Sequence, residues 1–171
     1  MVTYCIQSNN KAADVEITEM TVDDLDEVMA IERYSFVTPR SEKMFRLELR
    51  LPGAHNLVAK VNYESDRGIA GYINFLIVVG EVHIRDVAVR KDLRMRGIAS
   101  KLMAEMVKIS YHQMVLHATL EVRRSNTAAI ELYEKFGFEV KGVRPLYYSD
   151  TQEDALIMWA DLRESFREMN V

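Results

Sequence analysis

Residues Leu120–Phe138 read LEVRRSNTAAIELYEKFGF, and this stretch joins an apolar strand to an amphipathic helix through a polar turn. Side chains alternate along a strand, so Glu121 is expected at its carboxyl end, on the face opposite Leu120. Ser125 or Asn126 is placed to cap the helix that follows, and Gly137 is placed to end it. The stretch therefore predicts a strand, a tight turn and a helix.

Three polar side chains of this stretch could belong to one site: Glu121, Asn126 and Tyr133. Open α/β sheets bind ligands at the carboxyl ends of their strands, where Glu121 is expected. A salt bridge from Glu121 to Arg85 or Arg123 is the alternative interpretation. For Tyr133 the alternative is a core tyrosine with a satisfied hydroxyl. The residues alone leave both interpretations open.

Working outward, the pattern predicts an α/β (α+β) fold whose sheet is mixed, mostly antiparallel, twisted and of about seven strands, with helices on both faces. Hairpins in the first half and β-α-β crossings in the second half favour this arrangement. The expected strands are residues 14–20, 55–63, 68–79, 81–89, 115–122, 138–148 and 153–160, and the expected helices begin near Thr21, Ser41, Ile98 and Asn126.

The length of 171 residues fits one domain. We expect a flexible leader over residues 1–13, a single domain over 14–162 and a charged tail over 163–171. The net charge of −4 argues against a direct nucleic-acid partner, for which a basic stripe is expected.

Several features favour a cytoplasmic protein with no membrane partner. The single cysteine, Cys5, excludes an internal disulfide and fits a reducing compartment. The longest apolar run, near Phe75–Val79, is far shorter than a membrane span, and the N-terminus has no secretory pattern. The four histidines show no metal-ligand spacing, so no metal is expected.

Residues Arg94–Ala99 (RMRGIA) lie between a predicted strand and a predicted helix, with Arg90 close by. A helix N-terminus carries unpaired N–H groups and partial positive charge, so a pyrophosphate can bind there. Gly97 would let the backbone come close to such an anion. The alternative is a tight turn with solvated arginines. The segment lacks the Gly-Lys-Ser/Thr of a P-loop and the three glycines of a dinucleotide fingerprint.

Taken together, three segments resemble the GNAT family of acetyl-CoA-dependent N-acetyltransferases. The segments are Arg85–Met103 (RDVAVRKDLRMRGIASKLM), Leu120–Phe138 and Gly142–Trp159 (GVRPLYYSDTQEDALIMW), in the family's order. The chain looks closest to the RimI branch, the ribosomal-protein-alanine N-acetyltransferases, and to the related archaeal protein N-terminal acetyltransferases. The resemblance covers about residues 15–160.

The resemblance implies acetyl-CoA as co-substrate. It assigns Glu121 as the general base and Tyr133 as the general acid that returns a proton to the leaving thiolate. The cofactor would bind Val87, Ala88 and Val89 through its pantetheine arm, Arg94, Met95, Arg96, Gly97, Ile98, Ala99 and Ser100 through its pyrophosphate, and Asn126. The implied reaction is direct attack by an amine in a ternary complex.

The resemblance also assigns the acceptor's slot to Phe36, Pro39, Arg40 and Ser41 and to Tyr147 and Tyr148. Two positions depart from the family pattern. Pro39-Arg40-Ser41 stands where the family often has Pro-Trp-Ser, and Met95 replaces a commonly basic residue of the phosphate loop.

The leading hypothesis is an acetyltransferase for the N-terminal amine of a protein, ribosomal or other, that begins with alanine or another small residue. The alternatives are an acetyltransferase for lysine, a polyamine or another small amine, and a non-catalytic acetyl-CoA-binding sensor. An acceptor panel separates the two enzymes, while loss of turnover in variants of Glu121 or Tyr133 separates an enzyme from a sensor.

Overall fold

The computed structural model describes residues 2–4, 14–62 and 67–169. Within this part the chain forms two compact units, and the strands β4 (Arg67–Val78) and β5 (Glu81–Val89) contribute residues to both. Unit 1 runs to Asn74 and includes Asp86–Leu102, whereas unit 2 holds Phe75–Arg85 and the chain from Met103 onward. The single domain expected over residues 14–162 stays a prediction.

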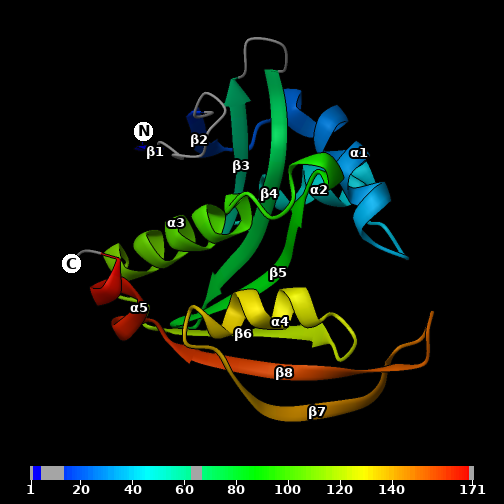
Figure 1. The fold of residues 1–171 in the computed structure, drawn as a ribbon, viewed down its shortest axis with the longest axis vertical. Helices are drawn as coiled ribbons and strands as arrows, with labels where there is room; N and C mark the ends of the chain where they lie inside the picture. Colours follow the sequence, from blue (N-terminus) through cyan, green and yellow to red (C-terminus); the bar gives the residue numbers. More distant parts are fainter. Residues whose placement is uncertain (1, 5–13, 63–66, 170–171) are drawn as a thin grey trace. The chain divides into compact units, whose positions relative to one another are not determined.

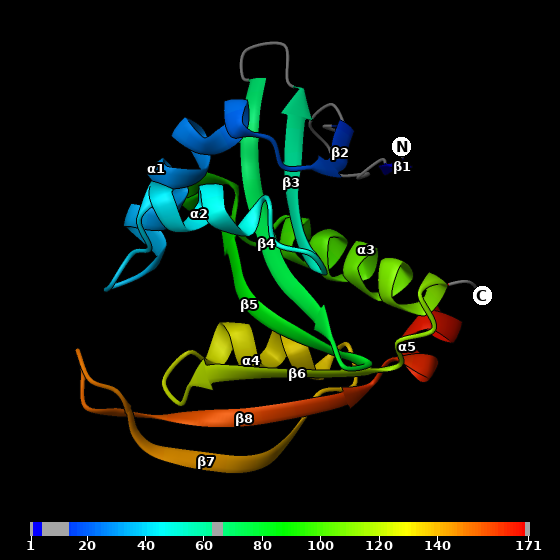
Figure 2. The same ribbon diagram turned by 180° about the vertical axis from the view of Figure 1, so that it is seen from behind.

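Unit 1 is built on antiparallel strands with two helices on one face. Its hydrogen-bonded strand order is β1-β2-β3-β4-β5, and Figure 2 shows α2 lying across β4. Its elements are β1 (Val2–Tyr4), β2 (Asp14–Glu19), η1 (Val22–Asp24), α1 (Leu25–Ser35), α2 (Glu42–Glu48), β3 (Ala54–Asn62), η2 (Lys91–Leu93) and the first turn of α3 (Ile98–His112).

Helix α1 forms because its apolar residues recur at helical spacing and its first turn is acidic. The carboxylate of Asp24 accepts hydrogen bonds from the backbone N–H and the hydroxyl of Thr21, at 2.8 and 3.0 Å. Asp26 and Glu27 follow in the first turn, where the helix dipole favours negative charge. The buried stripe packs into the core of unit 1, with Met20, Leu25, Val28, Met29, Ile31, Phe45, Val58, Ile69, Tyr72 and Ala88.

Unit 2 continues β4 and β5 into the order β5-β6-β8-β7. Strand β6 pairs in parallel with β5 and antiparallel with β8, which in turn pairs antiparallel with β7. Figure 1 shows α4 covering one face of β6. The elements of unit 2 are β6 (His117–Arg123), α4 (Thr127–Glu134), β7 (Glu139–Tyr148), β8 (Glu153–Asp161), α5 (Leu162–Glu168) and the rest of α3.

The expected fold class is confirmed, because the paired strands are mostly antiparallel and helices alternate with strands in the second half. Two short elements were not expected. Strand β1 lies inside the segment assigned to a flexible leader and pairs with β2, and helix α5 forms within the charged tail. Residues 5–13 of the leader, Cys5 included, lie outside the described residues.

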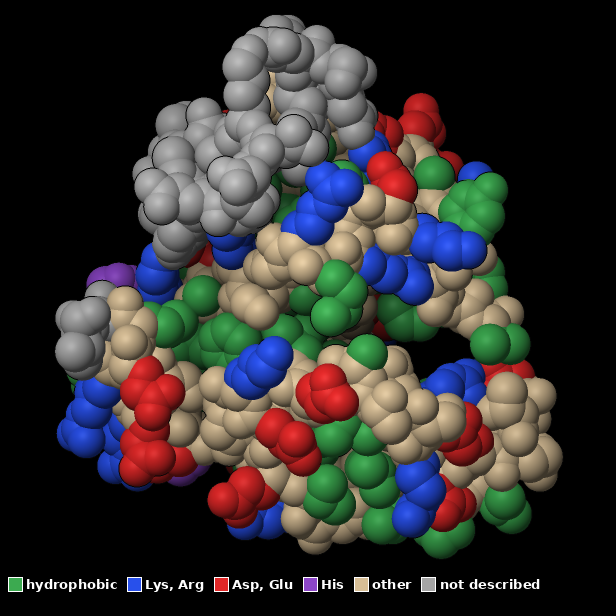
Figure 3. All heavy atoms as spheres, viewed as in Figure 1, with side chains coloured by type: hydrophobic (Ala, Val, Ile, Leu, Met, Phe, Trp, Pro, Cys, Tyr) green, Lys and Arg blue, Asp and Glu red, His purple; other side chains and the backbone are tan. Residues whose placement is uncertain are grey.

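Basic and acidic side chains are both present on the face drawn in Figure 3. On the face drawn in Figure 3, basic and acidic side chains alternate over the coloured residues rather than gathering into one patch of either sign. The net charge of −4 is consistent with this mixture. The charge distribution on this face therefore does not mark a functional site, and individual side chains must identify it.

Candidate active site

The carboxyl end of β5 is the part of unit 1 that is expected to bind the pantetheine arm of acetyl-CoA. Parallel pairing joins Glu81–Ile84 to His117–Leu120, and β5 continues past this ladder to Val89. Ala88 and Val89 are buried, and Val87 is half-buried. Beyond the end of a ladder, backbone N–H and C=O groups can hydrogen-bond a ligand instead of a neighbouring strand.

Gly71 of β4 belongs to this region and was not predicted from the sequence. A Cβ atom built on Gly71 would lie 2.6 Å from the carbonyl oxygen of Ala88 and 3.1 Å from the side chain of Val89. No real Cβ approaches a backbone oxygen so closely, so β4 and β5 pack at a distance that only glycine allows. A glycine inside a strand is the sequence signal for such an approach.

The loop before α3 has the backbone of an anion site. Met95 and Gly97 both adopt left-handed conformations, with φ of 60° and 76°. A Cβ built on Gly97 would meet nothing within 4 Å, and Met95 is 98% exposed. Successive turns of this kind point backbone N–H groups into one concavity, here at the start of the 15-residue helix α3. The backbone thus fits a pyrophosphate.

Arg94 fixes this loop to the rest of unit 1. Its Nε donates to the carbonyl oxygen of Val89 at 3.0 Å, and its Nη2 donates to the hydroxyl of Ser35 at 3.4 Å. The guanidinium therefore ties the loop to the end of β5 and the end of α1. This contact set supports a structural contribution from Arg94 beside any contact with phosphate.

Glu121 lies near the carboxyl end of β6 in unit 2, opposite Ile157 of β8. Its side chain is 34% exposed, and its Oε1 lies 3.3 Å from Nη1 of Arg144 on β7. The alternative salt bridge considered from the sequence was thus assigned to the wrong partners. Arg123 turns instead to Asp150, at 2.7 Å. The strand register accounts for these partners. Arg123 of β6 and Arg144 of β7 both lie opposite Ala155 of β8, whose small side chain leaves room for Arg144 to reach across β8 to Glu121.

Asn126 and Tyr133 are carried by α4, the helix that follows β6. The side-chain oxygen of Asn126 accepts a hydrogen bond from the N–H of Ala129 at 3.3 Å, so Asn126 is the cap. Tyr133 is buried, and its ring lies 5.9 Å from that of Phe138. The packing matches the core interpretation of Tyr133, and its role as general acid stays a prediction.

Tyr147 and Tyr148 end β7 with their rings 5.2 Å apart in an edge-to-face pair. Arg123 lies 3.9 Å above the ring of Tyr148, and Arg144 lies 5.5 Å above that of Tyr147. Burial raises the pKa of the Tyr148 hydroxyl to about 12, although the Arg123 guanidinium opposes this effect. The hydroxyl is therefore protonated, and can donate a hydrogen bond, throughout the neutral pH range.

In unit 1, the segment Phe36–Ser41 was assigned to the binding slot of the acceptor, and one of its residues, Arg40, makes several side-chain contacts. Phe36 is half-buried and packs on the core, while Pro39 and Ser41 are exposed. The Arg40 guanidinium bridges Glu48 and Asp86, with N–O distances of 2.7 Å to each. It also lies 4.3 Å above the ring of Phe45.

Charge balance keeps this guanidinium ionised. Burial alone would lower the pKa of Arg40, but the carboxylates of Asp86 and Glu48 outweigh burial and raise it. The backbone N–H of Arg40 also donates to the Glu32 carboxylate at 2.7 Å. Arg40 thus joins the segment after α1 to α2 and to β5.

The polar residues around Arg40 were not predicted from the sequence. Glu32 accepts a hydrogen bond from the Tyr72 hydroxyl, and Asn74 donates to Glu48 at 3.1 Å. Burial, together with the carboxylates of Asp86 and Glu32, raises the pKa of Tyr72 well above its usual value. One signal was present, because Glu32 falls on the apolar stripe of α1, three residues after Met29.

Neither a metal centre nor a membrane span is found in the part of the chain that the structure describes. Residues 2–4, 14–62 and 67–169 contain no cluster of histidine, cysteine, aspartate and glutamate suited to a metal ion. Within the same ranges, no helix has the length and apolar character needed to cross a bilayer.

Comparison with known proteins places these features in a family. The model of the Acetyltransferase (GNAT) family matches residues 25–138. The chain is 36% identical over 149 residues to a Bacillus subtilis (strain 168) protein provisionally named a [ribosomal protein bS18]-alanine N-acetyltransferase, aligning 86% of this chain and 96% of that protein. It is 30% identical over 166 residues to an N-alpha-acetyltransferase of Saccharolobus solfataricus, aligning 90% of this chain and 96% of that protein.

A solved structure agrees with these relatives. The ribosomal-protein-S18-alanine N-acetyltransferase from Escherichia coli superposes with a TM-score of 0.76 at 29% identity, over 86% of this chain and 94% of that one. The match to the family model covers both the loop before α3 and the strand–turn–helix that carries Glu121, Asn126 and Tyr133. The chain therefore belongs to the GNAT family and is an N-acetyltransferase.

Proposed function

We propose that this protein transfers an acetyl group from acetyl-CoA to the N-terminal amine of a protein that begins with alanine or another small residue. Relatives named for bS18-alanine N-acetylation and for N-alpha-acetylation support this choice of acceptor. The observation that carries it is the stretch Glu121–Tyr133, in which a partly exposed carboxylate, a capped helix start and a tyrosine follow one another within unit 2. In this proposal the acceptor is a ribosomal protein or another protein, and the reaction takes place in the cytoplasm.

The chemistry suits an α-amine. Only the neutral amine attacks a thioester, and an α-amine with a pKa of about 7.7–8.0 loses its proton at pH 7 for about 1 kcal/mol. A lysine with a pKa of about 10.4 costs about 4–5 kcal/mol. A carboxylate such as Glu121, acting directly or through one water, is a sufficient base for the first amine and a poor one for the second.

In this proposal the residues of each unit have their own task. Acetyl-CoA supplies the activated thioester. The loop Arg94–Ser100 and the N–H groups that open α3 hold the pyrophosphate, while Asn126 contributes amide donors that its cap does not use. Backbone N–H groups of Val87–Val89 stabilise the oxyanion that develops on the acetyl group. Tyr133 donates a proton to the departing thiolate.

The left-handed glycine of the phosphate loop gives a first test. Gly97→Val is expected to weaken acetyl-CoA binding about 10-fold, because a β-branched residue at this φ costs about 1–3 kcal/mol and moves the loop backbone. Isothermal titration with acetyl-CoA measures the Kd. Gly80→Val is the matched control, since Gly80 has a φ of 80°, equally open surroundings and a place in the β4–β5 turn. An equal loss of affinity in both variants would contradict the assignment.

The acceptor class is tested by thiol release from acetyl-CoA with short peptides. We expect turnover on peptides beginning with alanine or serine, and none on the same peptides when the α-amine is blocked. Turnover only on blocked peptides that contain lysine would replace the proposal by a lysine acetyltransferase. Acetyl-CoA binding without turnover on any amine would leave a sensor.

A further inference from the structure

The ladder between β7, which carries Tyr147 and Tyr148, and β8 is interrupted between Arg144 and Tyr148. Arg144 pairs with Ala155 and Tyr148 pairs with Glu153, so three residues of β7 stand opposite the single residue Asp154 of β8. Leu146, inside this bulge, has a left-handed φ of 53°. A bulge interrupts the regular ladder, so side chains must determine how the tip of the β7–β8 hairpin is held.

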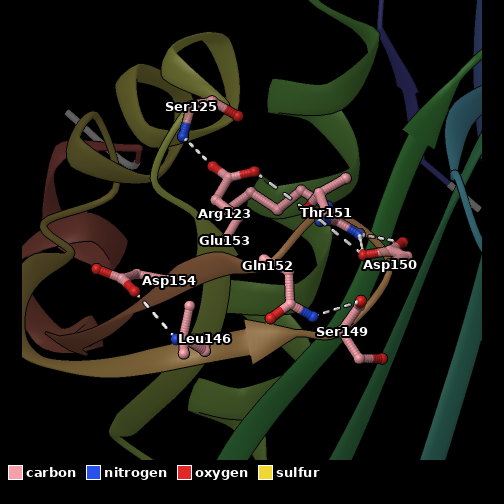
Figure 4. A network of polar contacts seen from close by, with 9 residues as sticks. All are labelled: Arg123, Ser125, Leu146, Ser149, Asp150, Thr151, Gln152, Glu153 and Asp154. Carbon is pink, nitrogen blue, oxygen red and sulfur yellow. Dashed lines mark hydrogen bonds and ion pairs between the residues drawn. The ribbon is translucent and has the colours of Figure 1, made fainter.

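Those side chains form the network drawn in Figure 4. The carboxylate of Asp154 accepts a hydrogen bond from the N–H of Leu146 at 3.0 Å. Gln152 donates to the carbonyl oxygen of Ser149 at 2.9 Å. These contacts stay within the hairpin, so they shape its tip without fixing it to the strand that carries Glu121.

Arg123 supplies that connection. Its Nη2 donates to both carboxylate oxygens of Asp150, at 2.9 and 2.7 Å, and its Nη1 donates to the hydroxyl of Thr151 at 2.5 Å. The guanidinium also lies 3.9 Å above the ring of Tyr148, and the side chain is 22% exposed. One planar cation therefore holds the tip through hydrogen bonds at its edge and a cation–π contact on its face.

The same network reaches the start of α4. Nη1 of Arg123 lies 3.9 Å from the Glu153 carboxylate, which accepts a hydrogen bond from the N–H of Ser125 at 2.6 Å. Ser125 directly precedes Asn126, the cap of the helix that carries Tyr133. Glu121 is two residues before Arg123 and so points to the same face of β6. Arg124 adds an exposed ion pair with Asp154 at 3.3 Å, but Arg123 is the residue that contacts the tip, the ring of Tyr148 and the Glu153 carboxylate together.

We propose that Arg123 is a positioning residue for the acceptor. It holds Tyr147 and Tyr148 against the end of β6, so that the wall they form is already in place when an acceptor N-terminus binds. The inference rests on the proposed function, in which these tyrosines line the acceptor's slot. It does not require Arg123 to touch the acceptor, the cofactor or the acetyl group.

The competing interpretation is a surface ion pair that contributes only to stability. Partly exposed pairs contribute little to stability, and an ion pair with that role alone would leave the kinetic constants unchanged when it is removed. A positioning role instead predicts a change confined to the acceptor. Preordering of the slot lowers the cost of binding the acceptor, so its loss raises the acceptor's KM and spares the chemical step.

The test measures steady-state kinetics for Arg123→Gln and Arg123→Lys with an alanine-initiated peptide and acetyl-CoA. We expect Arg123→Gln to raise the peptide KM about 10-fold while kcat and the KM for acetyl-CoA change less than about 3-fold. Arg123→Lys is expected to keep most of the defect, because an ammonium lacks the planar fork that fits Asp150 and Tyr148. Arg163→Gln is the control: it removes the ion pair between Arg163 of α5 and Asp161, the cap of that helix, and should leave all three constants unchanged.

Asp150→Asn provides a second variant, because it loosens the tip while leaving Arg123 over Tyr148. It should raise the peptide KM in the same direction, and it answers the question even where Arg123→Gln does not fold. A peptide KM equal to that of the wild type in these variants would overturn the inference. Failure of the wild-type enzyme to acetylate any α-amine would instead overturn the proposed function.

Discussion

Glu121→Gln is expected to lower kcat on an alanine-initiated peptide by about 100- to 10,000-fold, the usual contribution of a positioned general base. Glutamine keeps the shape of the side chain but cannot take a proton from the amine. The substitution also removes the ion pair with Arg144, which is partly exposed and contributes little to stability. The acetyl-CoA Kd and the thermal unfolding curve should therefore stay close to those of the wild type.

Arg144→Gln is the matched control for this prediction. It breaks the same ion pair from the other side and leaves the carboxylate of Glu121 in place. If the carboxylate itself is the base, Arg144→Gln keeps most of the activity that Glu121→Gln loses. Equal losses in the two variants would show that the ion pair, rather than the base, carries the effect. The rate of thiol release from acetyl-CoA, measured at fixed times, gives the activity of both variants.

Arg40→Met is expected to lower the free energy of unfolding by about 3–5 kcal/mol, since it leaves the carboxylates of Glu48 and Asp86 without their cation. Methionine is close to the aliphatic part of arginine in volume, so the loss reports charge more than packing. Urea denaturation followed by circular dichroism measures the change. Arg40→Met would alter acceptor binding only by displacing the segment before α2 that Arg40 holds in place.

Arg46→Met is the control for this second prediction. Arg46 lies on α2, the helix whose Glu48 pairs with Arg40, but the ion pair of Arg46 with Glu42 is exposed on both sides. Its loss should cost less than about 1 kcal/mol. If Arg40→Met also lost less than about 1 kcal/mol of unfolding free energy, the buried network would contribute no more than a surface pair.

The local elements of the site could be predicted from sequence because their signals are local. A strand with Glu121 near its carboxyl end, a cap at Asn126 and a helix that carries Tyr133 all follow from alternation and capping within one short stretch. The same holds for the loop at Gly97, where a glycine between a strand and a helix indicates a left-handed turn.

The ionic contacts could not be predicted, because their partners are far apart in the sequence. Arg40 meets Asp86 across 46 residues, and Glu121 meets Arg144 rather than either arginine considered for it. The second of these pairs depends on the register of β6, β7 and β8, which local patterns do not reveal. Local patterns also miss short elements. Strand β1 has only three residues, and the charged sequence of α5 gives little sign that Phe166 stacks on Tyr111.

The most direct test of the proposed function uses one peptide that begins with alanine and contains an internal lysine, both amines being free. After incubation with acetyl-CoA, tandem mass spectrometry locates the acetyl group. We expect it on the alanine nitrogen in the wild-type reaction and expect the product to be nearly absent with Glu121→Gln. Acetyl on the lysine side chain, with the α-amine untouched, would contradict the account.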